Sequence, residues 1–209
     1  MKELDDENVG LRAIQTLNNI TFITSLIDSI NIQYGGCYGN TFDCNCHHNI
    51  FGAKCNYNVF GCSCNNIVFG DQCNNNIFGN NCYGNVFGDF CTDNIFGNNC
   101  YDNKCLNNFI NNSFGNNCYS NTFVNSCQSN SFGSSCYLNS FEDSCSYNSF
   151  GNNCTRNTFG EDCRTNVFDN YCIQNVFGNN YQHNRFGPYC RNISFKLNAD
   201  KNAETLDNC

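Results

Sequence analysis

The side chains best suited to chemistry gather near the start of a repetitive stretch. Cys44, Cys46, His47 and His48 lie within five consecutive residues. Thiolate and imidazole groups are the ligands that zinc prefers in proteins. However, a C-x-C pair followed directly by two histidines is not a standard spacing for a structural zinc site. These four residues are therefore weak metal candidates, and the sequence predicts no bound cofactor.

A second pair of thiols has a spacing that could bring sulfur atoms together. The segment Cys62-Ser-Cys64 repeats Cys44-Asn-Cys46 after 18 residues. If the chain coils once every 18 residues, Cys44 and Cys62 stack in neighbouring coils with their Cα atoms about 5 Å apart. That separation lies inside the range that a disulfide needs. Two hypotheses stay open for this pair, an optional cross-coil disulfide and two reduced thiols.

The histidines show no pattern that is typical of catalysis. A Cys or Ser nucleophile needs a base beside it in a cleft. The chain has three histidines, His47, His48 and His183. None of them accompanies Ser, Cys or Asp in a known catalytic motif. The sequence therefore predicts that the protein is not an enzyme.

A nine-residue repeat must position all of these side chains. Stepping by nine from Phe42 to Phe195 meets Phe at seventeen of eighteen positions. Stepping by nine from Cys37 to Cys190 meets Cys at sixteen of eighteen, and Asn lies two residues before the Phe position in sixteen of eighteen repeats. Because no insertion disturbs this count, each repeat must be geometrically equivalent to its neighbours.

One repeat exchanges the two apolar residue types. Cys105 occupies the Phe position and Phe109 occupies the Cys position. A shared interior tolerates such an exchange because the total side-chain volume is conserved. We therefore predict that Phe and Cys both point inward and pack in one core, where Cys acts as a small hydrophobe.

A second period of 18 residues lies on top of the first. The string FGNNCY begins at Phe78, Phe96 and Phe114. A coil of 18 residues explains this spacing, and duplication of an 18-residue block is a compatible explanation. The period favours coils that close within one chain, with repeats interleaved between three chains as the alternative. Each coil has four inward positions, and the Val, Ile, Thr or Ser that usually precedes Phe suits short strands. The sequence thus predicts an all-β fold, a parallel four-sided β-solenoid with about 18 residues per coil, inward Phe and Cys ladders, and Asn ladders at its corners.

The repeats from residue 37 to residue 195 resemble the pentapeptide-repeat solenoids. That family forms right-handed four-sided β-helices with inward Phe or Leu and small inward partners. The sides of those coils advance by five residues, whereas these advance by four and five alternately. The Phe-Gly-Asn-Asn-Cys arrays also resemble those in tail proteins of phages and prophages of gut Bacteroides-type bacteria. RTX-type rolls share the 18-residue coil, but this sequence lacks their glycine-rich calcium motif.

Tyrosine forms a column of its own. Tyr83, Tyr101, Tyr119 and Tyr137 are 18 residues apart, and each follows a Cys that is predicted to point inward. We therefore expect the four rings to point outward. Stacked aromatic rings on a flat face could bind a glycan or a partner protein. Stacking that only stabilises the sheet is the alternative.

The two ends of the chain lack the repeat. Residues 1–36 are predicted to form a short α-helix followed by a joint at residues 34–36, and residues 196–209 form a polar cap or tail. Ile20, Ile23, Ile27 and Ile30 follow a 3-4-3 spacing. Ile at both seam positions of a coiled coil disfavours dimers and suits larger bundles such as trimers. The helix is expected to cap the solenoid, to join copies of the chain, or to do both.

Composition and charge exclude several classes of function. The formal net charge of −8 argues against nucleic-acid binding, because no basic stripe could neutralise phosphates. No apolar run approaches 18 residues, so membrane insertion is not expected. The first residues carry Glu3, Asp5 and Asp6 and lack the apolar region of a signal peptide. We expect synthesis in the cytoplasm, whose reducing conditions keep most of the 20 cysteines as thiols.

These properties favour a structural role. The sequence predicts a non-enzymatic rod or attachment element in an elongated homo-oligomer, with a trimer favoured. The resemblance to tail proteins implies a phage tail fibre or a tail-associated spike. It also implies a location in the virion and a protein or a surface glycan as receptor.

An alternative function comes from the pentapeptide-repeat resemblance. Some acidic members of that family mimic DNA and bind type II topoisomerases. A mimic of this kind needs two stripes of acids, whereas the acids here are expected to be scattered over different repeat positions: Asp71, Asp89, Asp102, Glu142, Asp143, Glu161 and Asp162. Ice binding is less favoured still, because the Thr-x-Thr columns of a flat ice-binding face are missing.

Overall fold

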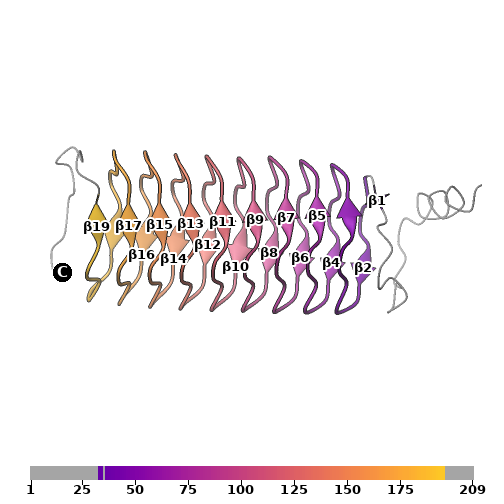
Figure 1. The fold of residues 1–209 in the computed structure, drawn as a ribbon, viewed down its shortest axis with the longest axis horizontal. Helices are drawn as coiled ribbons and strands as arrows, with labels where there is room; N and C mark the ends of the chain where they lie inside the picture. The colour runs from indigo at the N-terminus through magenta and orange to yellow at the C-terminus, as the bar shows by residue number, and fades with distance from the viewer. Residues whose placement is uncertain (1–32, 35, 196–209) are drawn as a thin grey trace, which may run out of the picture.

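The protein folds into a stack of coils along one axis (Figure 1). The computed structural model describes residues 33–34 and 36–195, which form a parallel β-solenoid of about nine coils. No helix occurs within these residues. The predicted N-terminal helix, the seam of Ile20, Ile23, Ile27 and Ile30, and the tail at 196–209 lie outside them. The all-β solenoid expected from the sequence is confirmed.

Each repeat contributes one strand of two residues, the Phe position and the residue before it. Because a strand alternates its side chains between two faces, the first residue points to solvent and the second to the core. These strands of the repeats are β2 (Thr41–Phe42), β3 (Ile50–Phe51), β4 (Val59–Phe60), β5 (Val68–Phe69), β6 (Ile77–Phe78), β7 (Val86–Phe87), β8 (Ile95–Phe96), β9 (Lys104–Cys105), β10 (Ser113–Phe114), β11 (Thr122–Phe123), β12 (Ser131–Phe132), β13 (Ser140–Phe141), β14 (Ser149–Phe150), β15 (Thr158–Phe159), β16 (Val167–Phe168), β17 (Val176–Phe177), β18 (Arg185–Phe186) and β19 (Ser194–Phe195). One further strand, β1 (Gln33–Tyr34), precedes the repeats.

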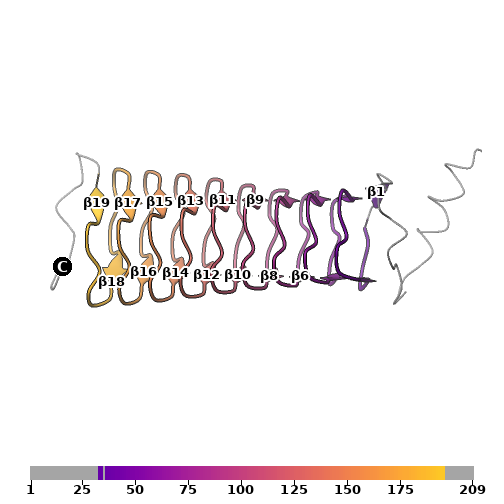
Figure 2. The same cartoon turned by 60° about the horizontal axis from the view of Figure 1, so that its bottom comes forward.

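Odd- and even-numbered strands form two separate parallel sheets (Figure 2). The odd strands make a ten-stranded sheet from β1 to β19, and the even strands make a nine-stranded sheet from β2 to β18. Neighbouring strands pair residues that are 18 apart, as in Phe78↔Phe96. Isolated bridges such as Tyr83↔Tyr101 and Thr92↔Ile110 form the two remaining sides. Four pairing columns therefore run along the axis, and each coil closes within one chain.

Strand pairing begins slightly before the repeat does. β1 pairs with β3 in the register Gln33↔Ile50 and Tyr34↔Phe51, a spacing of 17 residues rather than 18. The sequence places Tyr34 in a joint, whereas its backbone belongs to the ten-stranded sheet. The Asn-x-Phe-Gly pattern is absent around β1, so periodicity could not identify this strand.

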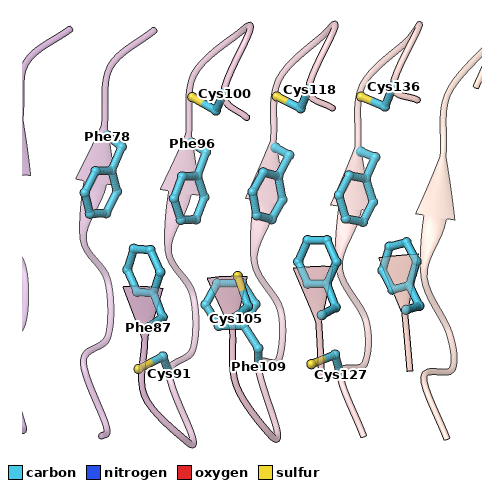
Figure 3. Packing of buried hydrophobic residues seen from close by; sticks show 14 of the residues in the cluster. Phe78, Phe87, Cys91, Phe96, Cys100, Cys105, Phe109, Cys118, Cys127 and Cys136 are labelled. Atoms are coloured by element: carbon cyan, nitrogen blue, oxygen red, sulfur yellow. The ribbon is translucent and has the colours of Figure 1, made fainter. Parts of the chain in front are cut away.

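Phe and Cys side chains form one continuous core. Phe rings of the same sheet stack face to face, as Phe78 and Phe96 do with centroids 4.9 Å apart and planes 8° apart. Rings of opposite sheets meet edge to face, as Phe78 and Phe87 do at 5.3 Å and 82°. Thiols flank the rings, and the Cys100 thiol donates to the carbonyl oxygen of Gly79 over 3.5 Å (Figure 3). The predicted Phe and Cys ladders are confirmed.

The exchanged pair shows that both ladders share one interior. Cys105 and Phe109 are both fully buried. The ring of Phe109 lies between the neighbouring Phe positions of the odd sheet, with its centroid 5.6 Å from Phe87 and 6.1 Å from Phe123 (Figure 3). It thus occupies space that the smaller Cys105 leaves open. The prediction made from conserved volume is correct.

The Asn before each strand builds a buried ladder. Asn94 Nδ2 donates to Oδ1 of Asn112 at 3.0 Å and to the carbonyl oxygen of Cys73 at 3.0 Å. Its Oδ1 accepts the backbone N–H of Asn76 at 2.9 Å and the side-chain amide of Asn76 at 3.1 Å. A buried polar group is costly unless it is paired. Because each amide also pairs backbone groups, the ladder satisfies the corner as predicted.

A coil this narrow also requires tight turns at its corners. The residues immediately before and two after the Cys position of each repeat adopt positive φ, as Asn99 (56°) and Asp102 (52°) do around Cys100. Short polar residues tolerate this left-handed region best. The Gly after Phe permits close stacking, because a Cβ at Gly79 would lie 2.8 Å from the backbone nitrogen of Cys62.

Candidate functional site

The thiol and imidazole cluster lies in the first coils. Cys46 is half-buried, and its thiol donates to the carbonyl oxygen of Asp43 at 3.3 Å. The rings of His47 and His48 meet edge to face at 5.2 Å. Within residues 33–34 and 36–195, no three His, Cys, Asp or Glu side chains come together as metal ligands would. Neighbouring residues in the sequence thus point to different sides of the coil.

Cys44 lies in a corner column that the sequence analysis did not identify. This column, here called the Asn corner column, holds the residue two after each even-numbered strand: Cys44, Cys62, Asn80, Asn98, Asn116, Ser134, Asn152, Asn170 and Pro188. Asn98 donates its backbone N–H to Oδ1 of Asn80 at 2.8 Å. Cys62 donates its backbone N–H to Sγ of Cys44 at 3.1 Å in the same way. Both cysteines are thiols in this structure, so the cross-coil disulfide stays a hypothesis.

The predicted tyrosine column is a regular stack on one side of the rod. Tyr83, Tyr101, Tyr119 and Tyr137 have successive centroid distances of 4.8, 4.8 and 5.0 Å and planes within 7° of parallel. Tyr137 is exposed, and the other three are half-buried. Burial, and then the neighbouring phenol of Tyr83 and carboxylate of Asp102, raise the pKa of Tyr101.

This geometry limits what the tyrosine column can bind. Each inner ring is covered on both faces by its neighbours, so only ring edges and hydroxyl groups face solvent. A sugar that stacks on an aromatic face would find one only at the ends of the column, beside Tyr83 or Tyr137. A partner protein could instead meet a row of hydroxyls repeating every 4.8–5.0 Å. Partner or glycan binding at these four residues remains a prediction.

Four of the acids form a regular column, which was not predicted from the sequence. Asp71, Asp89, Asp143 and Glu161 lie in one column, here called the acidic corner column, two residues after odd-numbered strands. Asp71 Oδ1 accepts the backbone N–H of Asp89 at 2.9 Å, and Asp143 Oδ1 accepts that of Glu161 at 2.7 Å. The expectation that these four acids are scattered is therefore wrong. Their separation by multiples of 18 residues was the available signal.

At the outward strand positions, exposed aliphatic side chains are most frequent in the first coils. On the nine-stranded sheet, Val59, Ile77 and Ile95 are 38%, 43% and 48% exposed. On the ten-stranded sheet, Ile50 and Val68 are 37% and 41% exposed. The outward strand positions beyond this point are mostly Ser, Thr or a charged residue, beginning with Lys104 and Ser113. The outward strand positions of both sheets thus change from mostly apolar to mostly polar after β8, with Val167 as an exposed exception in β16.

Comparison with known proteins adds no relative. No protein-family model matches the chain, and neither curated proteins nor solved structures gave a match. Among the described residues, none forms a helix long and apolar enough to cross a membrane. The coil length, the parallel pairing and the Phe and Cys ladders are consistent with a fold like that of the pentapeptide-repeat proteins.

Proposed function

We propose that the protein is a non-enzymatic structural rod that serves attachment or assembly within an elongated homo-oligomer. The observation that carries this proposal is the unbroken register of the two sheets. Every neighbouring pair of strands from β2 to β19 is offset by 18 residues. At about 4.8 Å per coil, the nine coils span roughly 40 Å.

The ladders make this rod stiff. Bending would have to open stacked rings, buried amide pairs and backbone hydrogen bonds on one side of the coil. Every strand between the ends is paired on both edges, so the sides offer no open strand for uncontrolled association. A uniform repeat array of this kind suits a spacer that carries load or presents a surface.

The exposed apolar columns support attachment through the first coils. Val59, Ile77 and Ile95 on one sheet, with Ile50 and Val68 on the other, leave apolar surface on two faces of the same coils. Contiguous exposed apolar surface is a common mark of an assembly interface. These coils follow the segment with the Ile20–Ile30 spacing, which favours a trimer. We therefore infer that copies associate near the N-terminal end of the rod.

The finer assignment to a phage tail fibre or spike rests on the resemblance of the Phe-Gly-Asn-Asn-Cys repeats to those of tail proteins. The test is the amount of this chain in virions purified by density gradient from a culture that carries its gene. Mass spectrometry should find the chain in a fixed ratio to a major tail protein, in multiples of three per particle. Recovery only in the lysate, with none in the virion band, would refute the tail assignment.

The oligomeric state tests the rod-in-an-assembly proposal separately. Light scattering on the eluting full-length protein should give three times the chain mass of 23.6 kDa. The variant Ile77→Asp should shift the mass toward the monomer, whereas Ser131→Asp, at an outward position of the same sheet, should not. A monomer for the unaltered chain would argue against the homo-oligomer.

The acidic corner column is the specific observation that favours a second candidate, a DNA mimic that binds a type II topoisomerase. However, neutral Asn107 and Asn125 separate Asp71 and Asp89 from Asp143 and Glu161. Residues 36–195 carry ten acids and six bases, so half of the net charge of −8 lies elsewhere in the chain. We therefore expect no inhibition of DNA supercoiling at micromolar protein. Inhibition that is lost in Asp71→Asn/Asp89→Asn would establish the second candidate instead.

A further inference from the structure

We infer that Cys44 and Cys62 form a site of reversible thiol oxidation. Their disulfide joins the coil that contains β2 to the coil that contains β4, the first two strands of the nine-stranded sheet. Cys44 is exposed and Cys62 is half-buried. The other described cysteines are all buried or half-buried on the inward columns. Thiol chemistry from solvent is thus expected to begin at Cys44, the one exposed thiol among the described residues. This inference is independent of the proposed function.

The backbone holds the two residues in register on both sides. Gly61 donates its backbone N–H to the carbonyl oxygen of Phe42 at 3.0 Å, and Asn45 donates to that of Cys62 at 2.9 Å. These bonds flank Cys44 and Cys62 directly. Stacked coils lie about 4.8 Å apart, within the Cα separation of natural disulfides. No backbone movement is needed to bring the two Cα atoms within range.

The side chain of Cys44 already points along the axis toward its partner. Its sulfur lies 3.1 Å from the backbone nitrogen of Cys62, where Asn residues of the same column place an oxygen. Rotation of the Cys62 side chain about its Cα–Cβ bond brings the second sulfur toward the first. Cys replaces Asn in this column at only two positions, and those two are consecutive. The pairing of the two replacements favours a joint role.

The reaction is thiol–disulfide exchange with a small-molecule disulfide such as oxidised glutathione. The Cys44 thiolate attacks one sulfur of that oxidant, forms a mixed disulfide and expels one small thiolate. The Cys62 thiolate then attacks Sγ of Cys44 and expels the second. Each cysteine loses one proton, and the oxidant takes up two electrons to become two thiols. A dithiol reductant reverses both steps.

The position in the fold gives the bond its effect. β2 is the terminal strand of the nine-stranded sheet and pairs only with β4. Terminal units of a repeat array open most readily because they have a neighbour on one side only. A bond from the end of β2 to the end of β4 ties the outermost coil to the next. Oxidation thus stops opening at the N-terminal end of the array.

The test uses the reduced full-length protein incubated with oxidised glutathione, then alkylated, digested and mapped by mass spectrometry. We expect a peptide linked through Cys44 and Cys62, and no disulfide between two copies of the chain. Dithiothreitol should reverse the link. The oxidised form should unfold about 5–10 °C higher than the reduced form. A link between two copies through Cys44, or a lasting mixed disulfide at Cys44 in the unaltered chain, would overturn the inference.

A matched variant separates chemistry from folding. Cys62→Asn restores the usual residue of the column and should melt at the same temperature as the reduced unaltered protein. With oxidised glutathione it should stop at the mixed disulfide on Cys44 and gain none of the thermal shift. If Cys62→Asn gains the same shift as the unaltered protein, the stabilisation does not come from this bond and the inference fails.

Discussion

Cys105 and Phe109 show how single side chains fill this core. Phe109 lies in a Cys position but contacts Phe87 and Phe123, the neighbours of Cys105 along the odd sheet. The packing of the core at this level therefore depends on the combined side-chain volume of Cys105 and Phe109. The sequence allowed this conclusion because the two departures fall within one repeat.

The first prediction is a double-mutant cycle on that pair. Phe109→Cys leaves a buried void and should cost about 2–4 kcal/mol of the free energy of unfolding. Cys105→Phe adds a ring to a filled space and should cost about 1–3 kcal/mol. The double variant restores the regular repeat and should unfold within about 1 kcal/mol of the original protein, measured in urea under reducing conditions. Additive losses would show that the two residues do not share space.

The second prediction concerns the buried amide ladder. Asn121 Nδ2 donates to the carbonyl oxygen of Cys100 at 3.1 Å, and its Oδ1 accepts the backbone N–H of Asn103 at 3.1 Å. Asn121→Leu leaves both groups buried without a partner and should cost about 2–4 kcal/mol in urea unfolding. Asn116→Leu is the control, because Asn116 is exposed in the Asn corner column and water can replace its bond. Equal losses would contradict the proposed cost of burial.

The third prediction concerns backbone strain. Thr165 adopts a φ of 56°, which a β-branched side chain tolerates poorly. Thr165→Asn should raise the free energy of unfolding by about 1 kcal/mol, because Asn accepts this conformation more readily. Thr158→Asn, in strand β15, should give no gain. A loss of stability in Thr165→Asn would mean that the Thr side chain makes contacts worth more than the strain.

At the scale of the strand and its corner, close stacking is the governing constraint. Gly79 allows one coil to approach the next because its missing Cβ would meet the nitrogen of Cys62 and the carbonyl carbon of Gly61 at 2.8 Å. The equivalent position of the other sheet carries Leu106, Val124 and Glu142 in successive coils. The even-numbered sheet carries Asp169 at this position, and a Cβ at Gly70 of the odd-numbered sheet would lie 2.7 Å from the backbone nitrogen of Ala53. Both corners are therefore tight at their glycines and hold a side chain at other levels.

The fourth prediction compares a tightly enclosed glycine with a residue that already holds a side chain at the same repeat position. Gly79→Ala forces two backbone segments apart and should lower the free energy of unfolding by about 1–3 kcal/mol. Val124→Ala removes methyl groups from a position that already holds a Cβ and should cost less than about 1 kcal/mol. Thermal and urea unfolding of both variants provide the comparison. A neutral Gly79→Ala would show that the even corner can relax.

Strands and side-chain ladders could be predicted from the sequence where the same residue type recurs at a fixed spacing. The strands β2 to β19 follow from the Phe position, and the Asn ladder follows from the Asn two residues earlier. β1 could not be identified, because it joins the sheet with a 17-residue offset and no Phe. The Asn and acidic corner columns were missed because their members vary in type, and their shared role is to accept a backbone N–H. That role becomes visible only when the coils are stacked.

At the scale of the whole molecule, several buried thiols link stability to pH. Hydrogen bonds between neighbouring thiols lower the pKa of Cys82 and Cys118 to about 4, whereas three other thiols shift in the opposite direction. Burial raises the pKa of Cys105 well above its ordinary value of 9.0. The hydrogen bond with Cys127, followed by burial, raises the pKa of Cys145 to about 12. The bond with Cys145, and then burial, raises the pKa of Cys163 as well. These thiols keep their protons in the folded protein at pH values where the unfolded chain loses them.

The fifth prediction follows from the sign of these shifts. A thiol whose pKa is raised in the folded protein stabilises the fold fully at pH values below 9.0, the pKa of the thiol in the unfolded chain. This stabilisation is lost as the pH rises from 9.0 toward the pKa in the folded protein. Each such thiol should remove about 1.4 kcal/mol per pH unit in that window. The three thiols with raised pKa values should therefore lower the urea midpoint under reducing conditions as the pH rises above 9. A midpoint that rises above pH 9 would contradict buried neutral thiols.

The uniform offset between paired residues also has a kinetic consequence. Backbone hydrogen bonds between coils join residues 17 to 19 positions apart all along the described chain. The mean sequence separation of contacts is therefore about one tenth of the chain length, a contact order in the range of fast-folding helical bundles rather than of β-sandwiches. Added coils would lower this ratio further. Each coil can dock as soon as its own 18 residues leave the ribosome, about one coil every 1–4 seconds. Growth of the folded rod can thus keep pace with translation.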